Sequence, residues 1–106
     1  MINEKIIAET GLTTDQICKV IADFEKNQQQ RSTTAKSFTI IPKDLTINEV
    51  APVIGLINVP DTKYKIVFLN SPSGTQTTWD EQSFFNIDLA EWQKEYGEVA
   101  QKLLNV

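Results

Sequence analysis

"KYKIVFLN" (63–70) is the stretch that decides the fold, because its apolar residues fall on both faces of the strand that it predicts. Successive side chains of an extended chain point to opposite sides. The two sides carry Tyr64, Ile66 and Phe68, and Val67 and Leu69, respectively. A strand that is apolar on both sides is typical of the centre of a sheet covered on both faces. The sequence therefore places this strand at the centre of the fold.

The segment after this strand, "SPSG" (71–74), predicts a tight turn. Pro72 has the fixed φ that suits the second position of a type I turn, and Gly74 suits the left-handed position that ends a three-residue hairpin loop. A phosphate-binding loop of the Walker type would need a second glycine and a lysine, and "SPSGTQTT" (71–78) has neither. We therefore expect residues 63–81 to form a β-hairpin.

The length of the loop sets the register of this hairpin. A three-residue loop places Val67 opposite Trp79 and Lys65 opposite Glu81, which is a favourable pair of charges. A four-residue loop places Trp79 on the other face, with Phe68. Both registers predict that Trp79 lies on an apolar face.

The most regular pattern outside the hairpin predicts a helix over residues 14–29. Thr13 and Gln16 form a capping box at its start. One apolar stripe follows at helical spacing, formed by Ile17, Val20, Ile21 and Phe24. A shorter helix over residues 2–9, ended by Gly11, would complete an N-terminal helical hairpin.

The C-terminal segment predicts another amphipathic helix, over about residues 88–104. Asp88 and Glu91 form its capping box. Its apolar stripe is wide and aromatic, and consists of Leu89, Trp92, Tyr96, Val99 and Leu103. Such a stripe either packs against the core of its own chain or is presented to a partner.

Two segments between the N-terminal helices and the hairpin complete the pattern. "SFTIIP" (37–42) predicts a short strand that Pro42 ends. Residues 44–59 have apolar residues at helical spacing, yet Pro52 would lie inside that helix, at a cost of about 3 kcal/mol. We expect either a kinked helix or two short pieces that meet at Pro52.

These elements predict a single α+β domain over residues 1–106. Its small antiparallel sheet has about three strands, including the 63–81 hairpin, and packs with the N-terminal helical hairpin and the C-terminal helix. A chain of 106 residues is long enough to bury one core and too short for two ordinary domains.

The composition argues against most catalytic chemistry. The chain has no histidine, which excludes the commonest general base, and its single cysteine, Cys18, cannot build a thiolate metal site within one chain. The neighbouring carboxylates Asp80 and Glu81 point to opposite faces of a strand, and Glu91 and Glu95 lie on an exposed helix face. We therefore expect no catalytic residue, no metal site and no cofactor.

The charge of −4 and the pI of about 4.7 disfavour nucleic acid as a partner, since affinity for phosphates comes from lysine and arginine. No secretory signal and no apolar stretch of membrane-spanning length is present in the sequence. We expect a cytoplasmic protein that does not enter a membrane.

"INEKIIAETGLTTDQICKVIADF" (2–24) is similar to the N-terminal helix pair of the histone-like, DNA-bending HU family. The likeness covers about a fifth of the chain. The remainder has no basic, proline-tipped β-arm, contains Arg31 as its one arginine, and is acidic. The function of that family is therefore not carried over.

The remaining hypothesis is a small acidic protein that is not an enzyme and acts by binding another protein, possible partners being basic ones. Inhibitors, toxin-immunity proteins and accessory proteins of phages or mobile elements are of this type. The expected contact residues are Trp79, Asp80, Glu81, Phe84 and Phe85, because interfaces favour aromatic anchors within a polar rim. These aromatic residues would otherwise pack under the last helix. The alternative is a nucleic-acid-binding regulator that uses helix 14–29 and hairpin 63–81.

Overall fold

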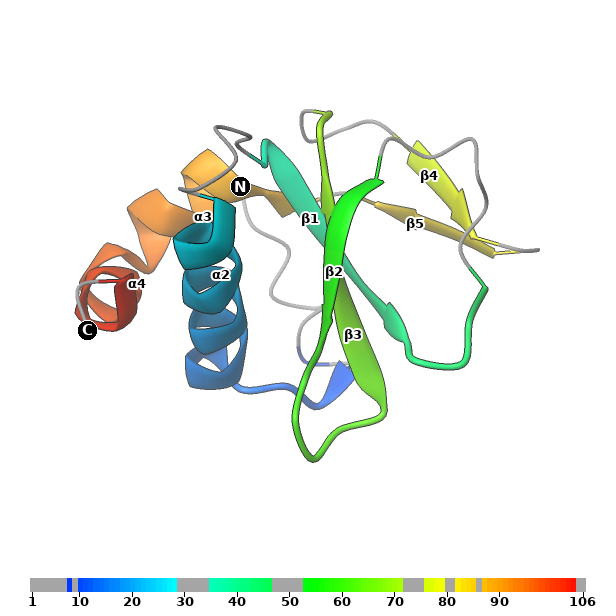
Figure 1. Ribbon diagram of the computed structural model, residues 1–106, viewed down its shortest axis with the longest axis horizontal. Coiled ribbons are helices and arrows are strands. Elements are labelled where there is room, and N and C mark those ends of the chain that lie inside the picture. The colour runs from blue at the N-terminus through cyan, green and yellow to red at the C-terminus, as the bar shows by residue number, and fades with distance from the viewer. Residues whose placement is uncertain are drawn as a thin grey trace.

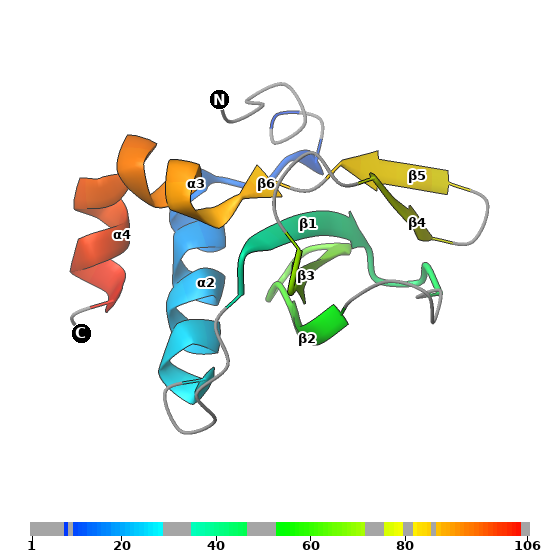
Figure 2. The ribbon, with the colours of Figure 1, turned by 90° about the horizontal axis from the view of Figure 1, so that it is seen from above.

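A computed structural model describes residues 8, 10–28, 35–46, 53–71, 76–79, 82–85 and 87–104 of the chain. Over these residues it forms α2 (Thr14–Gln28), β1 (Ser37–Pro42), β2 (Val53–Asn58), β3 (Tyr64–Leu69), β4 (Gln76–Trp79), β5 (Gln82–Phe85), β6 (Ile87–Asp88), α3 (Leu89–Glu95) and α4 (Gly97–Leu104). The helices lie on one side of a central sheet, and the pair β4–β5 lies on the other side (Figure 1, Figure 2). The fold is therefore α+β, as the sequence predicts.

The central sheet is antiparallel and has the strand order β2-β3-β1-β6. Strand β3 is an inner strand, with Val67 opposite Thr39 of β1 on one side and opposite Leu56 of β2 on the other. All of its residues from Lys65 to Leu69 are buried. The central position predicted for residues 63–70 is confirmed.

The predicted hairpin over residues 63–81 is wrong. Strand β3 pairs with β1 and β2, while β4 pairs with β5, so that Trp79 lies opposite Gln82 and not opposite Val67. The physical reason is the apolar surface of β3 on both faces, which "SFTIIP" and "VIGLIN" extend far better than the polar "QTTW" does. Burial of that surface outweighs the local preference of a turn sequence.

Lys65 was expected to face Glu81, and it does not. In the sheet it lies opposite Ile41 and Asn58, and its side chain is only 8% exposed. Its Nζ donates a hydrogen bond to the backbone oxygen of Leu45, at 2.9 Å. A backbone carbonyl therefore takes the place of the expected carboxylate.

Of the two alternatives for residues 44–59, the kinked helix is wrong, because residues Val53–Asn58, after Pro52, form strand β2. Residues 47–52, including Pro52, lie outside the described residues. The segment is rich in β-branched side chains, which favour a pleated surface. Beside β3, the side chains of Val53, Ile54 and Ile57 are partly buried against the apolar clusters of the sheet. Helical spacing alone could not reveal that neighbour.

Helix α2 begins as predicted, at the capping box. The backbone N–H of Thr13 donates to Gln16 Oε1 at 2.9 Å, and the N–H of Gln16 donates to Thr13 Oγ1 at 3.1 Å. Gly11 has a φ of 76°, the left-handed conformation expected of a residue that follows a helix. The predicted helix over residues 2–9 lies largely outside the described residues, so the N-terminal helical hairpin stays a prediction.

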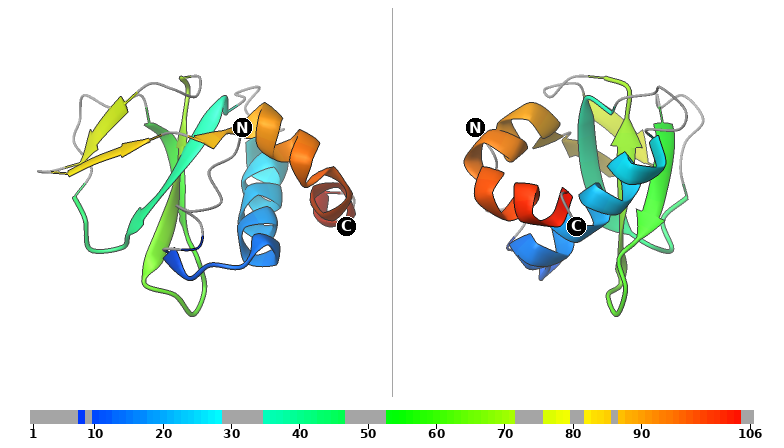
Figure 3. Two further views of the ribbon diagram at one scale, coloured as in Figure 1. Left: turned by 180° about the vertical axis from the view of Figure 1, so that it is seen from behind. Right: turned by 60° about the vertical axis from the view of Figure 1, so that its left-hand side comes forward.

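The predicted C-terminal helix is divided in two. Tyr96 ends α3 with a φ of −112° and a ψ of 28°, and α4 begins at Gly97. In all the views α2 lies between α4 and the sheet (Figure 3). Trp92 of α3 is fully buried and meets Phe38 of β1 edge to face, with ring centroids 5.5 Å apart. The aromatic stripe of this segment therefore packs, at Trp92, against its own chain.

Each face of the sheet carries its own apolar cluster. The face toward α2 holds the main core, including Ile17, Phe24, Phe38, Ile66 and Phe68. The opposite face holds Ile41, Val67 and Leu69, against which Leu45 and Val53 pack. At one end of that face the buried hydroxyl of Ser37 donates to the backbone oxygen of Ser71. The sheet is thus buried on both faces at its two inner strands.

Candidate functional site

The residues expected to contact a partner fall on a separate two-stranded ribbon, β4–β5. Trp79 is the last residue of β4, and Phe84 and Phe85 are the last two residues of β5. Asp80 and Glu81 connect Trp79 to Gln82 in the sequence and lie outside the described residues. The ribbon lies beside β1, through β5, and on the opposite side of the sheet from the helices (Figure 1).

The register of the ribbon sorts its aromatic residues between two faces. Thr77 lies opposite Phe84, and Trp79 lies opposite Gln82. Because residues two apart in a strand share a face, Trp79 and Phe84 belong to the same face of the ribbon and are diagonal neighbours across it. Phe85 lies opposite Gln76 and belongs to the other face. The register of β4 with β5 thus places Trp79 and Phe84 at diagonal positions of the ribbon.

A pocket lies on the helical side of the molecule, where α2 passes the start of α3. Its volume is about 470 Å³. The residues that line it come from α2, the segment before β1, and the β6–α3 junction: Glu25, Ala35, Lys36, Asp88, Leu89, Ala90 and Gln93. Its size is within the range of small-molecule sites.

Two carboxylates line this pocket, and they have different tasks. Asp88 is the N-cap of α3, and its Oδ1 accepts hydrogen bonds from the backbone N–H of Ala90 at 2.9 Å and of Glu91 at 3.2 Å. Glu25 is half-buried, and burial raises the pKa of its carboxyl above the ordinary value. Asp88 therefore caps the N-terminus of α3, while Glu25 is the carboxyl group of this pocket whose pKa is raised.

Glu25 was not singled out in the sequence, although one signal pointed to it. Cys18, Ala22 and Glu25 follow one another at helical spacing, next to the stripe that faces the sheet. Cys18 and Ala22 are buried, which places this second line against other elements of the fold. A charged residue that continues a line of small buried residues is a candidate for a partly buried carboxylate.

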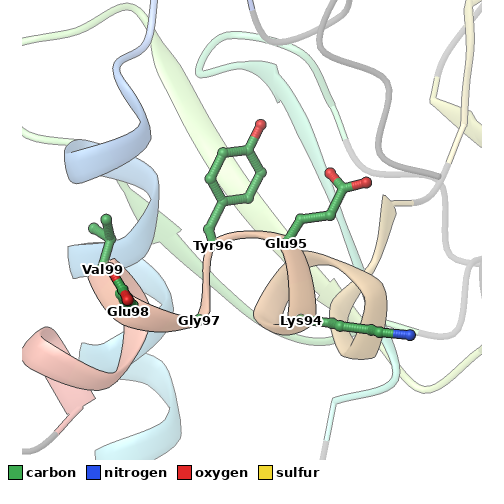
Figure 4. Close-up of a pocket in the computed structure, with 6 residues that line it drawn as sticks. All are labelled: Lys94, Glu95, Tyr96, Gly97, Glu98 and Val99. Carbon is green, nitrogen blue, oxygen red and sulfur yellow. The ribbon is translucent and has the colours of Figure 1, made fainter.

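A second pocket, also of about 470 Å³, lies at the junction of α3 and α4. Figure 4 shows Glu95 and Tyr96 directed to one side of the junction and Lys94 directed away from them. The lining residues are the six consecutive residues 94–99. Because Lys94, Glu95 and Glu98 are exposed, this hollow has the character of an open helix joint and not of a catalytic cleft.

The one cysteine lies inside the helical layer. Cys18 is 2% exposed, and this burial raises the pKa of its thiol above the ordinary value. A contact with the Trp92 side chain lowers the pKa in part, and the negative charge of Asp15 raises it. Trp92 Nε1 makes no hydrogen bond of ordinary geometry among the described residues, so its contact with the sulfur is a weak one. The thiol is therefore kept protonated at neutral pH, which makes it a poor nucleophile.

The described part of the chain shows neither a metal-binding cluster nor a membrane-spanning helix. It contains no group of three or more cysteine, aspartate and glutamate side chains that could together hold a metal ion. Among its helices, none has both the length and the apolar character that crossing a membrane requires.

Comparison with known proteins gives no relative from which a site could be transferred. No protein-family model matches this chain, and neither a curated protein nor a solved structure does.

Proposed function

We propose that this protein is not an enzyme and acts by binding another protein through the ribbon β4–β5. The observation that carries the proposal is the placement of the ribbon, which forms its own two-stranded sheet on the side of the molecule away from the helices. Trp79 and Phe84 belong to one face of it. A paired aromatic anchor of this kind is typical of interface centres.

Charge supports a basic partner. The chain carries a net charge of −4, and Asp80 and Glu81 lie in the sequence between the two strands of the ribbon. Acidic groups that are close to an aromatic anchor in the sequence give an interface both steering and specificity toward a basic surface. Inhibitors, immunity proteins and accessory proteins of phages or mobile elements are the classes whose task this arrangement would serve.

Two features of the fold argue against the alternative of a nucleic-acid reader. The hairpin over residues 63–81, which was to serve as its wing, does not form. On the exposed side of α2, Lys19 and Lys26 are interspersed with Asp15 and Asp23, so no continuous basic surface results. A nucleic-acid ligand would have to be held against this mixed charge.

The proposal is tested by affinity capture from the source cell with a charge-reversed variant, Asp80→Lys with Glu81→Lys. We expect one wild-type partner to be lost from the variant. The matched control is Glu95→Lys with Glu98→Lys, which changes the net charge by the same amount at two exposed positions in the α3–α4 joint. A partner that survives the first pair of changes, or is lost with both pairs, argues against the ribbon as the binding site.

The aromatic part of the surface is tested with the purified partner. Trp79→Ala is expected to weaken binding by at least about thirtyfold, since truncation of an anchor residue costs roughly 2 kcal/mol or more. Circular dichroism of the variant checks that the fold is kept. Unchanged affinity in a folded Trp79→Ala variant would remove Trp79 from the proposed interface.

A further inference from the structure

The pocket between α2 and the start of α3 collects side chains from three segments that are far apart in the chain. Glu25 comes from α2, Lys36 precedes β1, and Gln93 comes from α3. Ala35 and Leu89, which are both buried, supply apolar lining. Both helices lie on the side of the sheet away from the ribbon β4–β5 (Figure 2). The pocket is therefore separate from the proposed protein-binding surface.

Backbone hydrogen bonds hold the wall of this pocket that carries Lys36. The N–H of Lys36 donates to the oxygen of Leu69 at 3.0 Å, and the N–H of Leu89 donates to the oxygen of Lys36 at 3.2 Å. The next residue, Ser37, pairs with Asp88 in the sheet. The backbone from which the Lys36 side chain extends is therefore fixed by its neighbours on two sides. A binding site needs such support to keep its groups in place.

The pocket carries one negative and one positive side chain that do not neutralise each other. Glu25 is half-buried and Lys36 is exposed. Neither forms an ion pair with the other or with any other residue among those that the structure describes. Burial raises the pKa of Glu25, and no cation of the described residues offsets this effect. A ligand that brings a cation to Glu25 relieves the cost of its burial.

These two charges restrict the class of ligand. A simple amine would pair with Glu25 and be repelled by Lys36, whereas a simple carboxylate would be attracted to Lys36 and repelled by Glu25. A neutral ligand would leave both side chains without a partner. A molecule that carries both charges pairs with each of them at once.

We propose that this pocket binds a small zwitterion, an α-amino acid with an aliphatic side chain. Its ammonium group pairs with Glu25, and its carboxylate pairs with Lys36 and accepts a hydrogen bond from the amide of Gln93. Its aliphatic side chain lies against Ala35 and Leu89. The volume of about 470 Å³ admits a ligand of this size.

Three probes with the same isobutyl group test the charge requirement in the intact chain. They are L-leucine, L-leucinamide, which keeps the ammonium and lacks the carboxylate, and 4-methylpentanoate, which lacks the ammonium. Each is titrated at pH 7 and followed by the backbone amide signals of the protein in NMR. Because the pocket is open and its charges are partly solvated, we expect a Kd for leucine on the order of 1 mM.

The expected pattern is specific. Leucine shifts the amide signals of Leu89, Ala90 and Gln93 in a saturable way, and each analogue binds at least about tenfold more weakly, since it loses a charged hydrogen bond. An analogue that binds as tightly as leucine would overturn the proposal. So would leucine that causes no saturable shift at these three amides.

Two neutral variants test the two charged side chains. Glu25→Gln and Lys36→Gln are each expected to weaken leucine binding by at least about tenfold, while circular dichroism shows that the fold is kept. The matched controls are Asp23→Asn and Lys26→Gln, which remove the same charges at exposed positions of α2 that do not line the pocket. Unchanged leucine affinity in a folded Glu25→Gln or Lys36→Gln variant, or an equal loss in the controls, would remove the site from this pocket.

Discussion

Phe24 of α2 and Phe68 of β3 stack almost parallel, with ring centroids 3.7 Å apart and an angle of 5° between the rings. Gly55 of β2 lies against the edge of the Phe24 ring. A Cβ atom at position 55 would come within 2.6 Å of Cε2 of Phe24. The stack thus joins helix and sheet at a point where the neighbouring strand has no room for a side chain.

Gly55→Ala is therefore expected to destabilise the fold by about 1–3 kcal/mol, because the Phe24 ring must move from its place on Phe68 to admit the methyl group. The measurement is urea unfolding followed by tryptophan fluorescence. Gly97→Ala is the control, since a Cβ atom there meets nothing within 4 Å, and its effect is expected to stay within about 1 kcal/mol. Equal stability of the Gly55→Ala variant and the wild type would refute this account of the contact.

The N-terminus of α3, capped by Asp88, gives a second prediction. Asp88→Ala removes the acceptor of the N–H groups of Ala90 and Glu91 and should lower the free energy of unfolding by about 1 kcal/mol. Asp88→Asn keeps an acceptor oxygen and should retain most of that stability. The pair is compared by urea unfolding at one pH. If the Asp88→Asn variant loses as much stability as the Asp88→Ala variant, the charge of Asp88, and not its capping hydrogen bonds, is responsible.

Glu25 predicts a dependence of stability on pH. Its pKa is raised by burial, so the native chain binds more protons than the unfolded chain between the ordinary pKa of 4.5 and the native value. The protonated carboxyl of Glu25 therefore adds to the free energy of unfolding below pH 4.5. This contribution is lost as the pH rises through the native pKa. Glu25→Gln should be more stable than the wild type at pH 7 and lose this part of the pH dependence.

The check for Glu25 is a series of urea unfolding curves from pH 4 to pH 7. Glu98→Gln, the same chemical change at an exposed position, controls for the loss of one negative charge. If the Glu25→Gln and wild-type stabilities run parallel over this range, burial of Glu25 does not affect stability.

Cys18 reports on opening of the helical layer. Because the thiol is 2% exposed and burial raises its pKa, an exposed-thiol reagent at pH 8 should modify the native chain at least about 1,000-fold more slowly than the urea-unfolded chain. The absorbance of the released chromophore follows the reaction. Labelling of native protein at the unfolded rate would contradict the buried position of the thiol.

Prediction from the sequence succeeded where the information is local. The capping box of Thr13 and Gln16 and the N-cap of Asp88 are formed by atoms within three residues of one another, and both are present. Apolar residues on both faces correctly identified residues 63–70 as an inner strand. In each case the pattern and the structure are set by neighbours along the chain.

Prediction failed where a choice of partner was required. The turn sequence after β3 suggested that the chain folds back on it, and the helical spacing within residues 44–59 suggested a kinked helix as one of two alternatives. Both preferences were overridden by long-range contacts between β3 and its two neighbours. For the candidate site, the sequence supplied the residues of the ribbon, but its predicted register joined Trp79 to the wrong strand.

The sequence by itself determined the helix starts, the inner strand, the acidic charge and the lack of histidine chemistry. These follow from residue types and from spacings of a few positions. Only the tertiary structure decided which strands are neighbours, that β2 is left as an uncharged edge, and that Trp79 shares a ribbon face with Phe84. The physical reason is that strand pairing is chosen by the apolar surface it buries, and that surface is assembled from segments far apart in the chain.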